Sequence, residues 1–295
     1  MTASGTSTRE GSASGVRVIR DLDELRACLD SARAAQRRVA LVPTMGNLHA
    51  GHIALVHRAR ELGEVVIATI FVNPFQFGAN EDFDSYPRTF DQDLAQLAQA
   101  RCDLVFAPQG ATVYPHGPDV TTRVEVPRLG DILCGESRPG FFRGVATVVN
   151  ILFNMVQPDV AVFGNKDYQQ LLVIRRMVDD LRLRVRIEGV ATVREADGLA
   201  MSSRNAYLSA AQRERAPAIH RTLLEARAAL RSGERDHARV QARGHEALVR
   251  AGLRPDYFQV RRANDLEPAI DPGDALVVLA AVHLGKARLI DNVTV

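Results

Sequence analysis

Hydrophobic positions along the chain predict strands and helices that alternate from about Val18 onward. Short apolar runs rich in β-branched residues predict buried strands, and apolar residues spaced three and four apart predict helices that pack on them. The expected strands cover residues 38–42, 65–72, 104–107 and 160–163. One expected helix has its apolar positions at Ile53, Leu55, Val56 and Ala59, others cover about 89–100 and 143–156, and another begins near Tyr168. This alternation is typical of a parallel sheet with crossover helices.

The pattern changes beyond about residue 188. Two Ala/Arg-rich helical stretches, 210–231 and 236–251, are followed by strand-like runs at 257–261, 275–282 and 288–290. Helices and strands grouped in this way are typical of an α+β unit. We therefore expect an α/β protein with a Rossmann-like parallel-sheet N-terminal domain (16–188) and a smaller α+β C-terminal domain (189–295). Residues 1–15, rich in Ser, Thr and Gly, are expected to form a disordered tail.

Composition narrows the class of protein. A chain of 295 residues is long enough for two domains with a substantial core, and its 46% hydrophobic and 24% charged residues are ordinary for a soluble protein. A net charge of +2 gives no electrostatic reason to expect nucleic acid or an anionic membrane as a partner. The longest apolar run, 275–282, is well short of the roughly 20 residues that span a bilayer. Because residues 1–15 also lack the apolar core of a signal peptide, we expect a cytoplasmic protein.

Cysteine usage argues against a structural disulfide framework or a zinc ribbon. Cys28, Cys102 and Cys134 are odd in number, far apart and without CxxC spacing. We expect three reduced thiols.

Two imidazoles carry the strongest chemical signal. His49 and His52 follow the strand predicted at 38–42 and lie near the first turn of the next predicted helix, with Gly46 and Gly51 beside them. Residues three apart share a helix face, and a helix N-terminus favours anions, so the pair suits the phosphates of a nucleotide. The alternatives are a structural role or a metal site, although two histidines without a nearby third ligand fall short of a zinc set.

Three further segments combine polar groups that suit a nucleotide and a small acid. Lys166 and Asp167 follow the strand at 160–163, where a lysine reaches phosphates and an aspartate accepts ribose hydroxyls; the alternative is a capping aspartate beside a solvated lysine. Residues 202–204, Ser-Ser-Arg, suit a phosphate clamp, or else belong to a polar surface loop. Asn73 and Gln76 suit a small polar acid, or else a turn with a capping asparagine.

The chain lacks a GxSxG elbow and a P-loop, so nothing indicates a covalent enzyme intermediate. The arginines between 175 and 186 are expected to form a solvated face.

The motifs PTMGNLHAGH, FVNPFQFG, EDFDSYPRT, SRPGFFRGVATVV, GNKDYQQL and TVREADGLAMSSRNAYLS, in this order over residues 43–209, resemble the pantoate–β-alanine ligases of the HxGH nucleotidyltransferase superfamily. The resemblance implies joining of (R)-pantoate to β-alanine through a pantoyl adenylate, with ATP converted to AMP and pyrophosphate. It also implies Mg²⁺ carried mainly by the ATP phosphates, with no protein metal ligand, and a homodimer.

The resemblance also assigns roles to residues. It implies catalytic groups at His49, His52 and Lys166; ATP contacts at Thr44, Met45, Gly164, Lys166, Asp167, Val193, Met201, Ser202, Ser203 and Arg204; and pantoate contacts at Asn73, Gln76 and Gln170. The chain departs from the family pattern at Ala50, Phe141 and Asn165, where the family often has Glu, His and a polar residue such as Glu.

Two other functions stay open at this point. A nucleotidyltransferase that stops at a nucleotidylated product would not release AMP when an amine is supplied, and a nucleotide sensor without turnover would bind ATP without producing pyrophosphate.

Overall fold

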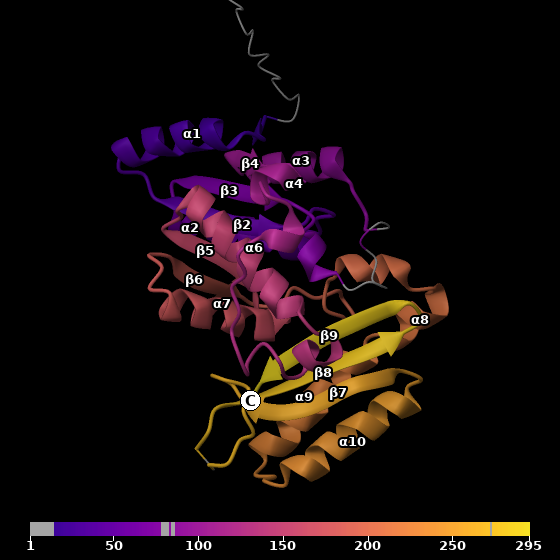
Figure 1. Cartoon of the computed structure of the whole chain (residues 1–295). Coiled ribbons are helices and arrows are strands. Elements are labelled where there is room, and N and C mark those ends of the chain that lie inside the picture. Colours follow the sequence, from indigo (N-terminus) through magenta and orange to yellow (C-terminus); the bar gives the residue numbers. More distant parts are fainter. Residues whose placement is uncertain (1–14, 78–82, 84–85, 272) are drawn as a thin grey trace, which may run out of the picture.

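Two sheets organise the computed structural model, which describes residues 15–77, 83, 86–271 and 273–295 (Figure 1). The expected tail therefore lies almost entirely outside the described residues. The first sheet is parallel with the strand order β1-β4-β3-β2-β5-β6, and the second is antiparallel with the order β7-β8-β9. This confirms the expected fold class, a Rossmann-like parallel sheet followed by a smaller α+β unit.

The strands of the parallel sheet are β1 Arg17–Ile19, β2 Val39–Thr44, β3 Val65–Ile70, β4 Leu104–Phe106, β5 Val160–Gly164 and β6 Arg186–Val190. Its helices are α1 Leu22–Ala34, α2 Ala50–Leu62, α3 Phe90–Gln99, α4 Gly110–Val113, α5 Cys134–Ser137, α6 Phe141–Val156 and α7 Tyr168–Asp180, with 3₁₀ turns η1 Pro74–Gln76, η2 Pro118–Val120 and η3 Asn165–Asp167. The alternation that the hydrophobic pattern predicted is present throughout.

Alternating side chains of β2 show why this strand is apolar without interruption. Leu41 packs in the cluster that holds the apolar faces of α1, α6 and α7, whereas Ala40 and Val42 pack in the cluster of α2 and α3. Because helices cover both faces of a parallel sheet, its central strands have no solvent side that could take polar residues.

The antiparallel sheet consists of β7 Arg254–Arg262, β8 Leu276–Leu284 and β9 Ala287–Thr294, and it is accompanied by η4 Ser203–Tyr207, α8 Ala210–Arg215, α9 Ala218–Arg231 and α10 His237–Arg250. Val278 and Ala280 of β8 pack with α9 and α10, while Val277 and Leu279 belong to the core cluster of the parallel-sheet half. Figure 1 shows α9 and α10 on one side of this sheet and the N-terminal half on the other.

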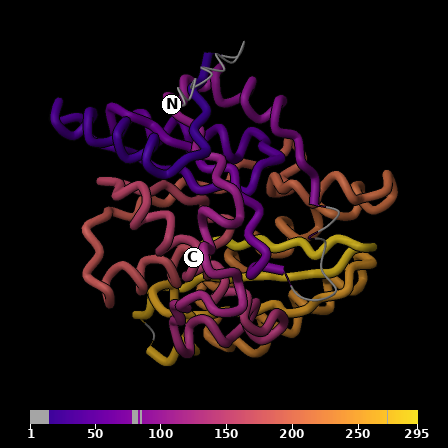
Figure 2. The backbone as a smooth tube through the Cα atoms, turned by 45° about the horizontal axis from the view of Figure 1, so that its top comes forward, coloured from indigo at the N-terminus to yellow at the C-terminus, as the bar shows by residue number. Residues whose placement is uncertain are grey.

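The second sheet also meets the segment that precedes α6. Tyr257 OH lies 3.1 Å from Cys134 Sγ, and Ser137 Oγ donates to Asp256 at 2.7 Å. In Figure 2 the yellow strands accordingly run beside the magenta part of the chain. The three cysteines are free thiols, as expected.

Several predicted elements of the C-terminal part differ from the structure in their bounds; β9, for example, covers Ala287–Thr294 instead of the expected 288–290. The helical stretch expected at 210–231 is interrupted at Pro217, because proline has no N–H to donate and ends the preceding helix. Strand β7 begins at Arg254 instead of Tyr257, with an irregularity between Pro255 and Tyr257; Pro255 is tolerated because β7 is an edge strand. The division after residue 188 stays a prediction, and β6 spans that position.

No helix within the described ranges is long and apolar enough to cross a bilayer.

Candidate functional site

The motif residues meet where the order of the parallel sheet reverses. Strands β2 and β5 are neighbours, but the chain continues from β2 to β3 on one side and from β5 to β6 on the other. Open α/β sheets bind ligands at the carboxyl ends of such strands. His49 follows β2 and Lys166 follows β5, and both line a cavity of about 1060 Å³.

Residues of both halves of the molecule line this cavity. The lining includes all but one of the residues assigned above: Thr44, Met45, His49, His52, Gln76, Gly164, Lys166, Asp167, Gln170, Val193, Met201, Ser202, Ser203 and Arg204. A volume at the upper end of ordinary small-molecule sites leaves room for a nucleotide and a second small molecule.

The two histidines hold each other in place through the first turn of α2. His49 is the N-cap, and its Nδ1 atom accepts the N–H of Gly51 at 3.1 Å. Nδ1 of His52 accepts the backbone N–H of His49 at 3.3 Å. The spacing of three residues is therefore that of a capping box, in which the side chain at the third helical position bonds back to the N-cap residue. The ring centroids are 4.1 Å apart.

Both imidazoles are neutral at pH 7. Burial and, to a smaller extent, the positive charge of Lys166 together lower the pKa of His49 to about 4, against an opposing effect of Asp167. Burial, followed by the effects of His49 and Lys166, lowers the pKa of His52 to about 3. Because Nδ1 of each ring accepts a hydrogen bond, the single proton of each neutral ring is on Nε2. The site therefore offers two N–H donors without two positive charges.

Gly51 is required by the His49 ring. A Cβ atom at position 51 would lie 2.7 Å from Cε1 of His49 and 2.9 Å from its Nδ1 atom. Any larger residue would push the ring from its place, because real Cβ atoms do not approach so closely. The glycine of the motif thus makes room for the imidazole, in addition to any close approach by a ligand.

A buried carboxylate fixes the loop before His49, and the sequence analysis missed it. Asp93 of α3 is 1% exposed and accepts the backbone N–H groups of Asn47 at 2.9 Å and Leu48 at 2.8 Å. These bonds hold a loop in which Asn47 has a positive φ of 51°. The available signal was the position of Asp93 four residues before Leu97, on the apolar face of the predicted helix.

Lys166 and Asp167 form the second part of the site. The Lys166 side chain is 19% exposed, and its Nζ atom lies 3.7 Å from Oδ2 of Asp167. A mobile cation held near one carboxylate retains donors for an incoming anion. The backbone carbonyls of Asn165 and Lys166 both accept from Nδ2 of Asn292 on β9, at 2.9 Å each.

The Ser-Ser-Arg segment docks on the histidine loop from the C-terminal half. Ser203 Oγ donates to the backbone carbonyl of Asn47 at 3.2 Å. Ser202 caps η4, because its Oγ accepts the N–H of Arg204 at 3.3 Å. The segment is therefore not a free surface loop, and its hydroxyls lie at the same cavity as His49.

Asn73 does not reach the cavity. It is 1% exposed, its Nδ2 atom donates to Gly144 O at 3.2 Å, and its Oδ1 atom accepts from Tyr114 OH at 2.6 Å and from the N–H of Phe75. It is the N-cap of η1, which is the turn described above as the alternative. Its amide is fully engaged in the fold, so it positions the segment that carries Gln76.

Several cavity residues were not anticipated from the sequence. Gln169 is buried and ties the chain before α5 to α7, with Nε2 donating to Leu129 O at 2.9 Å and Ile132 O at 2.7 Å. At one end of the cavity Arg288 forms an ion pair with Asp256 at 2.7 Å and contacts Cys134 Sγ at 3.4 Å. Such contacts join residues that are far apart in sequence, so a local sequence pattern does not predict them.

Two of the three departures from the family pattern, Phe141 and Asn165, make local packing contacts. Phe141 lines the cavity, and the guanidinium of Arg138 lies 3.7 Å from the centre of its ring, a cation–π contact. The Asn165 amide packs against Gly189 of β6, where a Cβ would lie 2.3 Å from Oδ1. Ala50 is the first residue of α2.

Comparison with known proteins gives one consistent result. The profile of the family described as pantoate-beta-alanine ligase matches residues 17–294. The chain is 56% identical to the pantothenate synthetase of Chromohalobacter salexigens over 275 residues, which cover 93% of this chain and 97% of that protein. It is also 56% identical to the pantothenate synthetase of Pseudomonas putida KT2440, over 93% of this chain and 96% of that one.

Solved structures agree. The crystal structure of pantothenate synthetase from Thermus thermophilus is similar, with a TM-score of 0.88 and 46% identity over 94% of this chain and 99% of that chain. A pantoate-beta-alanine ligase from Francisella tularensis, solved in complex with beta-gamma ATP and beta-alanine, has a TM-score of 0.80 and 31% identity over 95% of this chain and 97% of that chain.

Proposed function

This chain belongs to the pantoate–β-alanine ligase family and condenses pantoate with β-alanine using ATP, and from this premise we propose that the cavity between β2 and β5 carries out both steps of the reaction. In the first step a carboxylate oxygen of pantoate attacks the α-phosphorus of ATP, and the bond from that phosphorus to pyrophosphate breaks. In the second step the amine of β-alanine attacks the acyl carbon, and AMP leaves. The observation that carries the proposal is the pair of neutral Nε2–H donors beside Lys166.

His49 and His52 donate to the oxygens of the α-phosphate as negative charge develops on them. The fixed Nδ1 bonds support this role, because donors that are already oriented need no reorganisation when the charge moves. Lys166, Ser202, Ser203 and Arg204 bind the rest of the triphosphate. Nucleotidyl transfer relies on alignment and charge stabilisation more than on a protein nucleophile, which suits a site built of donors.

The remaining lining residues bind the nucleoside and the acid. Asp167 and Gly164 contact the ribose, and Met45 contacts the centre of the adenylate. Thr44, Val193 and Met201 also contact ATP. Gln76 and Gln170 bind pantoate, and Asn73 acts only by holding the turn that carries Gln76.

The residues of the site suit a Mg²⁺ ion that is bound mainly by the ATP phosphates. The groups assigned to the phosphates include the nitrogen donors of His49, His52, Lys166 and Arg204. The one carboxylate among the assigned residues, Asp167, is next to Lys166. Mg²⁺ prefers oxygen ligands and keeps several waters, so the phosphate oxygens would hold it, with the Ser202 and Ser203 hydroxyls as neutral oxygens nearby. Bound there, it would neutralise phosphate charge.

A homodimer is also part of the proposal, supported by the family resemblance, and sedimentation velocity tests it.

The reaction itself is tested by measuring pyrophosphate and AMP from ATP, Mg²⁺ and pantoate, with and without β-alanine. The proposal expects pyrophosphate only when pantoate is present and catalytic AMP only when β-alanine is added as well. Pyrophosphate release that does not depend on pantoate would refute the proposal. ATP binding without any pyrophosphate would also refute it and would favour the sensor described above.

A further inference from the structure

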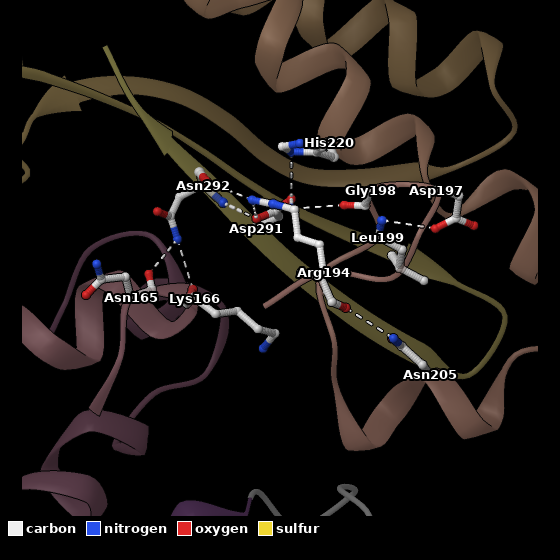
Figure 3. A network of polar contacts seen from close by, with 11 residues as sticks. Asn165, Lys166, Arg194, Asp197, Gly198, Leu199, Asn205, His220, Asp291 and Asn292 are labelled. Carbon is white, nitrogen blue, oxygen red and sulfur yellow. Dashed lines mark hydrogen bonds and ion pairs between the residues drawn. The ribbon is translucent and has the colours of Figure 1, made fainter. Parts of the chain in front are cut away.

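Two consecutive residues of β9 contact two loops of the cavity that are distant in sequence. Asp291 is 4% exposed and binds Arg194, and Asn292 binds the turn η3 that carries Lys166. Figure 3 shows the two side chains reaching to opposite sides of the strand, Asp291 toward Arg194 and Asn292 toward Asn165 and Lys166.

The Asp291 side is a bidentate ion pair. The two terminal nitrogens of Arg194 donate to the two carboxylate oxygens of Asp291 at 2.7 and 2.9 Å. The same guanidinium donates to Gly198 O at 3.1 Å, so it joins β9 to the turn at 195–199. Planar forks of this kind fix both distance and direction.

From Arg194 the constraint continues to the serine pair. The N–H of Met201 bonds to Val193 O at 3.0 Å, and the N–H of Glu195 bonds to Leu199 O at 2.8 Å, which closes a short hairpin around Arg194. Asn205 Nδ2 donates to Ala200 O at 3.1 Å and attaches the end of the segment to this hairpin. Ser202 and Ser203 lie between these two attachments.

His220 packs behind the ion pair. Its Nδ1 atom is buried and lies 3.6 Å from Oδ2 of Asp291, and its ring occupies the space that a Cβ on Gly198 would need, 2.9 Å from that position. Burial acts to raise the pKa of Asp291, but the neighbouring His220 and Arg194 side chains hold it below its ordinary value. The carboxylate is therefore charged at neutral pH and keeps the fork formed.

The Asn292 side is a double donation to backbone. One Nδ2 group donates to two consecutive carbonyls, those of Asn165 and Lys166, at 2.9 Å each. A large change in the backbone torsions between these two carbonyls would lose one of the bonds. The position from which the Lys166 side chain projects is thus set by a strand of the other half of the molecule.

We infer that Asp291 and Asn292 are positioning residues for nucleotidyl transfer: β9 sets the distance between the Lys166 turn and the Ser202–Ser203 segment, which are two of the groups that bind the triphosphate. This inference rests on the phosphate roles given under the proposed function. Neither residue needs to touch substrate, because a displacement of about 1 Å produced far from the reacting atoms can slow a reaction roughly 10²-fold.

The test separates the two chemical steps in single turnovers. Adenylate formation is measured by rapid quench with ATP, Mg²⁺ and pantoate; the bound adenylate, prepared with pyrophosphatase present, is then mixed with β-alanine. The variants are Asn292→Ala and Arg194→Lys, which keeps the charge but loses the fork. Thr294→Ala, an exposed position of the same strand, is the control.

Both variants are expected to slow adenylate formation between about 10- and 100-fold while changing the aminolysis rate less than about threefold, because the triphosphate has gone by the second step. Thr294→Ala should match the wild type in both steps. Equal losses of rate in both steps with a lowered Tm would mean a general structural role. A wild-type rate of adenylate formation by Asn292→Ala would show that the contact of Asn292 with the Lys166 turn does not affect the reaction. Either result overturns the inference. A wild-type enzyme without pantoate-dependent pyrophosphate release would instead overturn the proposed function.

Discussion

His52 accepts the backbone N–H of His49 through Nδ1 at 3.3 Å, so one imidazole fixes the start of the helix on which the other is the cap. The bond serves local folding and the site at once. It satisfies a backbone donor at the helix N-terminus, and it leaves Nε2–H of His52 as the donor available to a ligand.

Replacing His49 by Asn separates these two contributions. Asn is among the best N-cap residues, so His49→Asn should keep the stability of α2. Loss of one oriented donor should still slow adenylate formation by about 10² to 10³. Thermal melting and rapid-quench measurement of adenylate test both halves of this expectation; His49→Ala serves as comparison and should lose both stability and rate. A fast His49→Asn enzyme would remove the imidazole from the mechanism.

Gly51→Ala should damage the site through sterics alone. The added methyl would stand 2.7 Å from Cε1 of His49, so the ring must turn and its Nδ1 bond must weaken. We expect adenylate formation to fall at least about 10-fold, since a displaced donor loses most of its effect. Gly110→Ala is the matched control, because that position has open space around it. If Gly51→Ala and Gly110→Ala form adenylate at the same rate, the close contact does not constrain the His49 ring.

Stability should fall as the pH drops below the ordinary pKa of histidine. Both pKa values are lowered in the folded protein, to about 4 and about 3, so between these values and about 6.5 the unfolded chain binds more protons than the folded one. The free energy of unfolding therefore decreases from pH 6.5 toward pH 4. Urea titrations of the wild type and His49→Asn across this range should show the shallower pH dependence in the variant. If the free energy of unfolding depends on pH equally in the two proteins, His49 does not have the lowered pKa given above.

Asp93→Asn should loosen the loop before the histidines. The carboxylate accepts two backbone N–H groups, and an amide can accept only one of them and turns its own donors toward the other. We expect a loss of about 1 to 3 kcal/mol in the free energy of unfolding, together with slower adenylate formation. Asp91→Asn, on the exposed side of the same helix, should leave both unchanged. Urea unfolding and the pyrophosphate assay measure the two effects. Wild-type values of both for Asp93→Asn would contradict the role given to Asp93.

The hydrophobic pattern was sufficient for the four inner strands of the parallel sheet, β2 to β5, because they are buried and their helices are amphipathic, which are local properties. It did not place the two edge strands, because β1 has only three residues and β6 is partly exposed and carries Arg186 and Glu188. The pattern was insufficient at Pro217, where the proline interrupts a stretch with helical periodicity. It also missed the start of β7, because the pairing there is irregular between Pro255 and Tyr257.

Motif spacing predicted which groups line the cavity, since each motif follows a strand end that the topology brings to the same edge. Asn73 shows the limit. Its amide is used by Tyr114 and Gly144, partners that lie 41 and 71 positions away in the chain, and no local signal separates such a residue from a ligand contact. Asp291 and Asn292 were missed for the same reason, whereas Asp93 had a local signal in its position on the apolar face of the predicted helix.

The alternation along β8 has a consequence for how the protein comes apart. Val277 and Leu279 are embedded in one apolar cluster while Val278 and Ala280 are embedded in the other. Strand β8 therefore belongs to both hydrophobic cores, so unfolding of either half would expose the core of the other half to solvent. Denaturation should involve the entire molecule at once, and a nucleotide bound in the cavity between the two halves should raise the melting temperature of both.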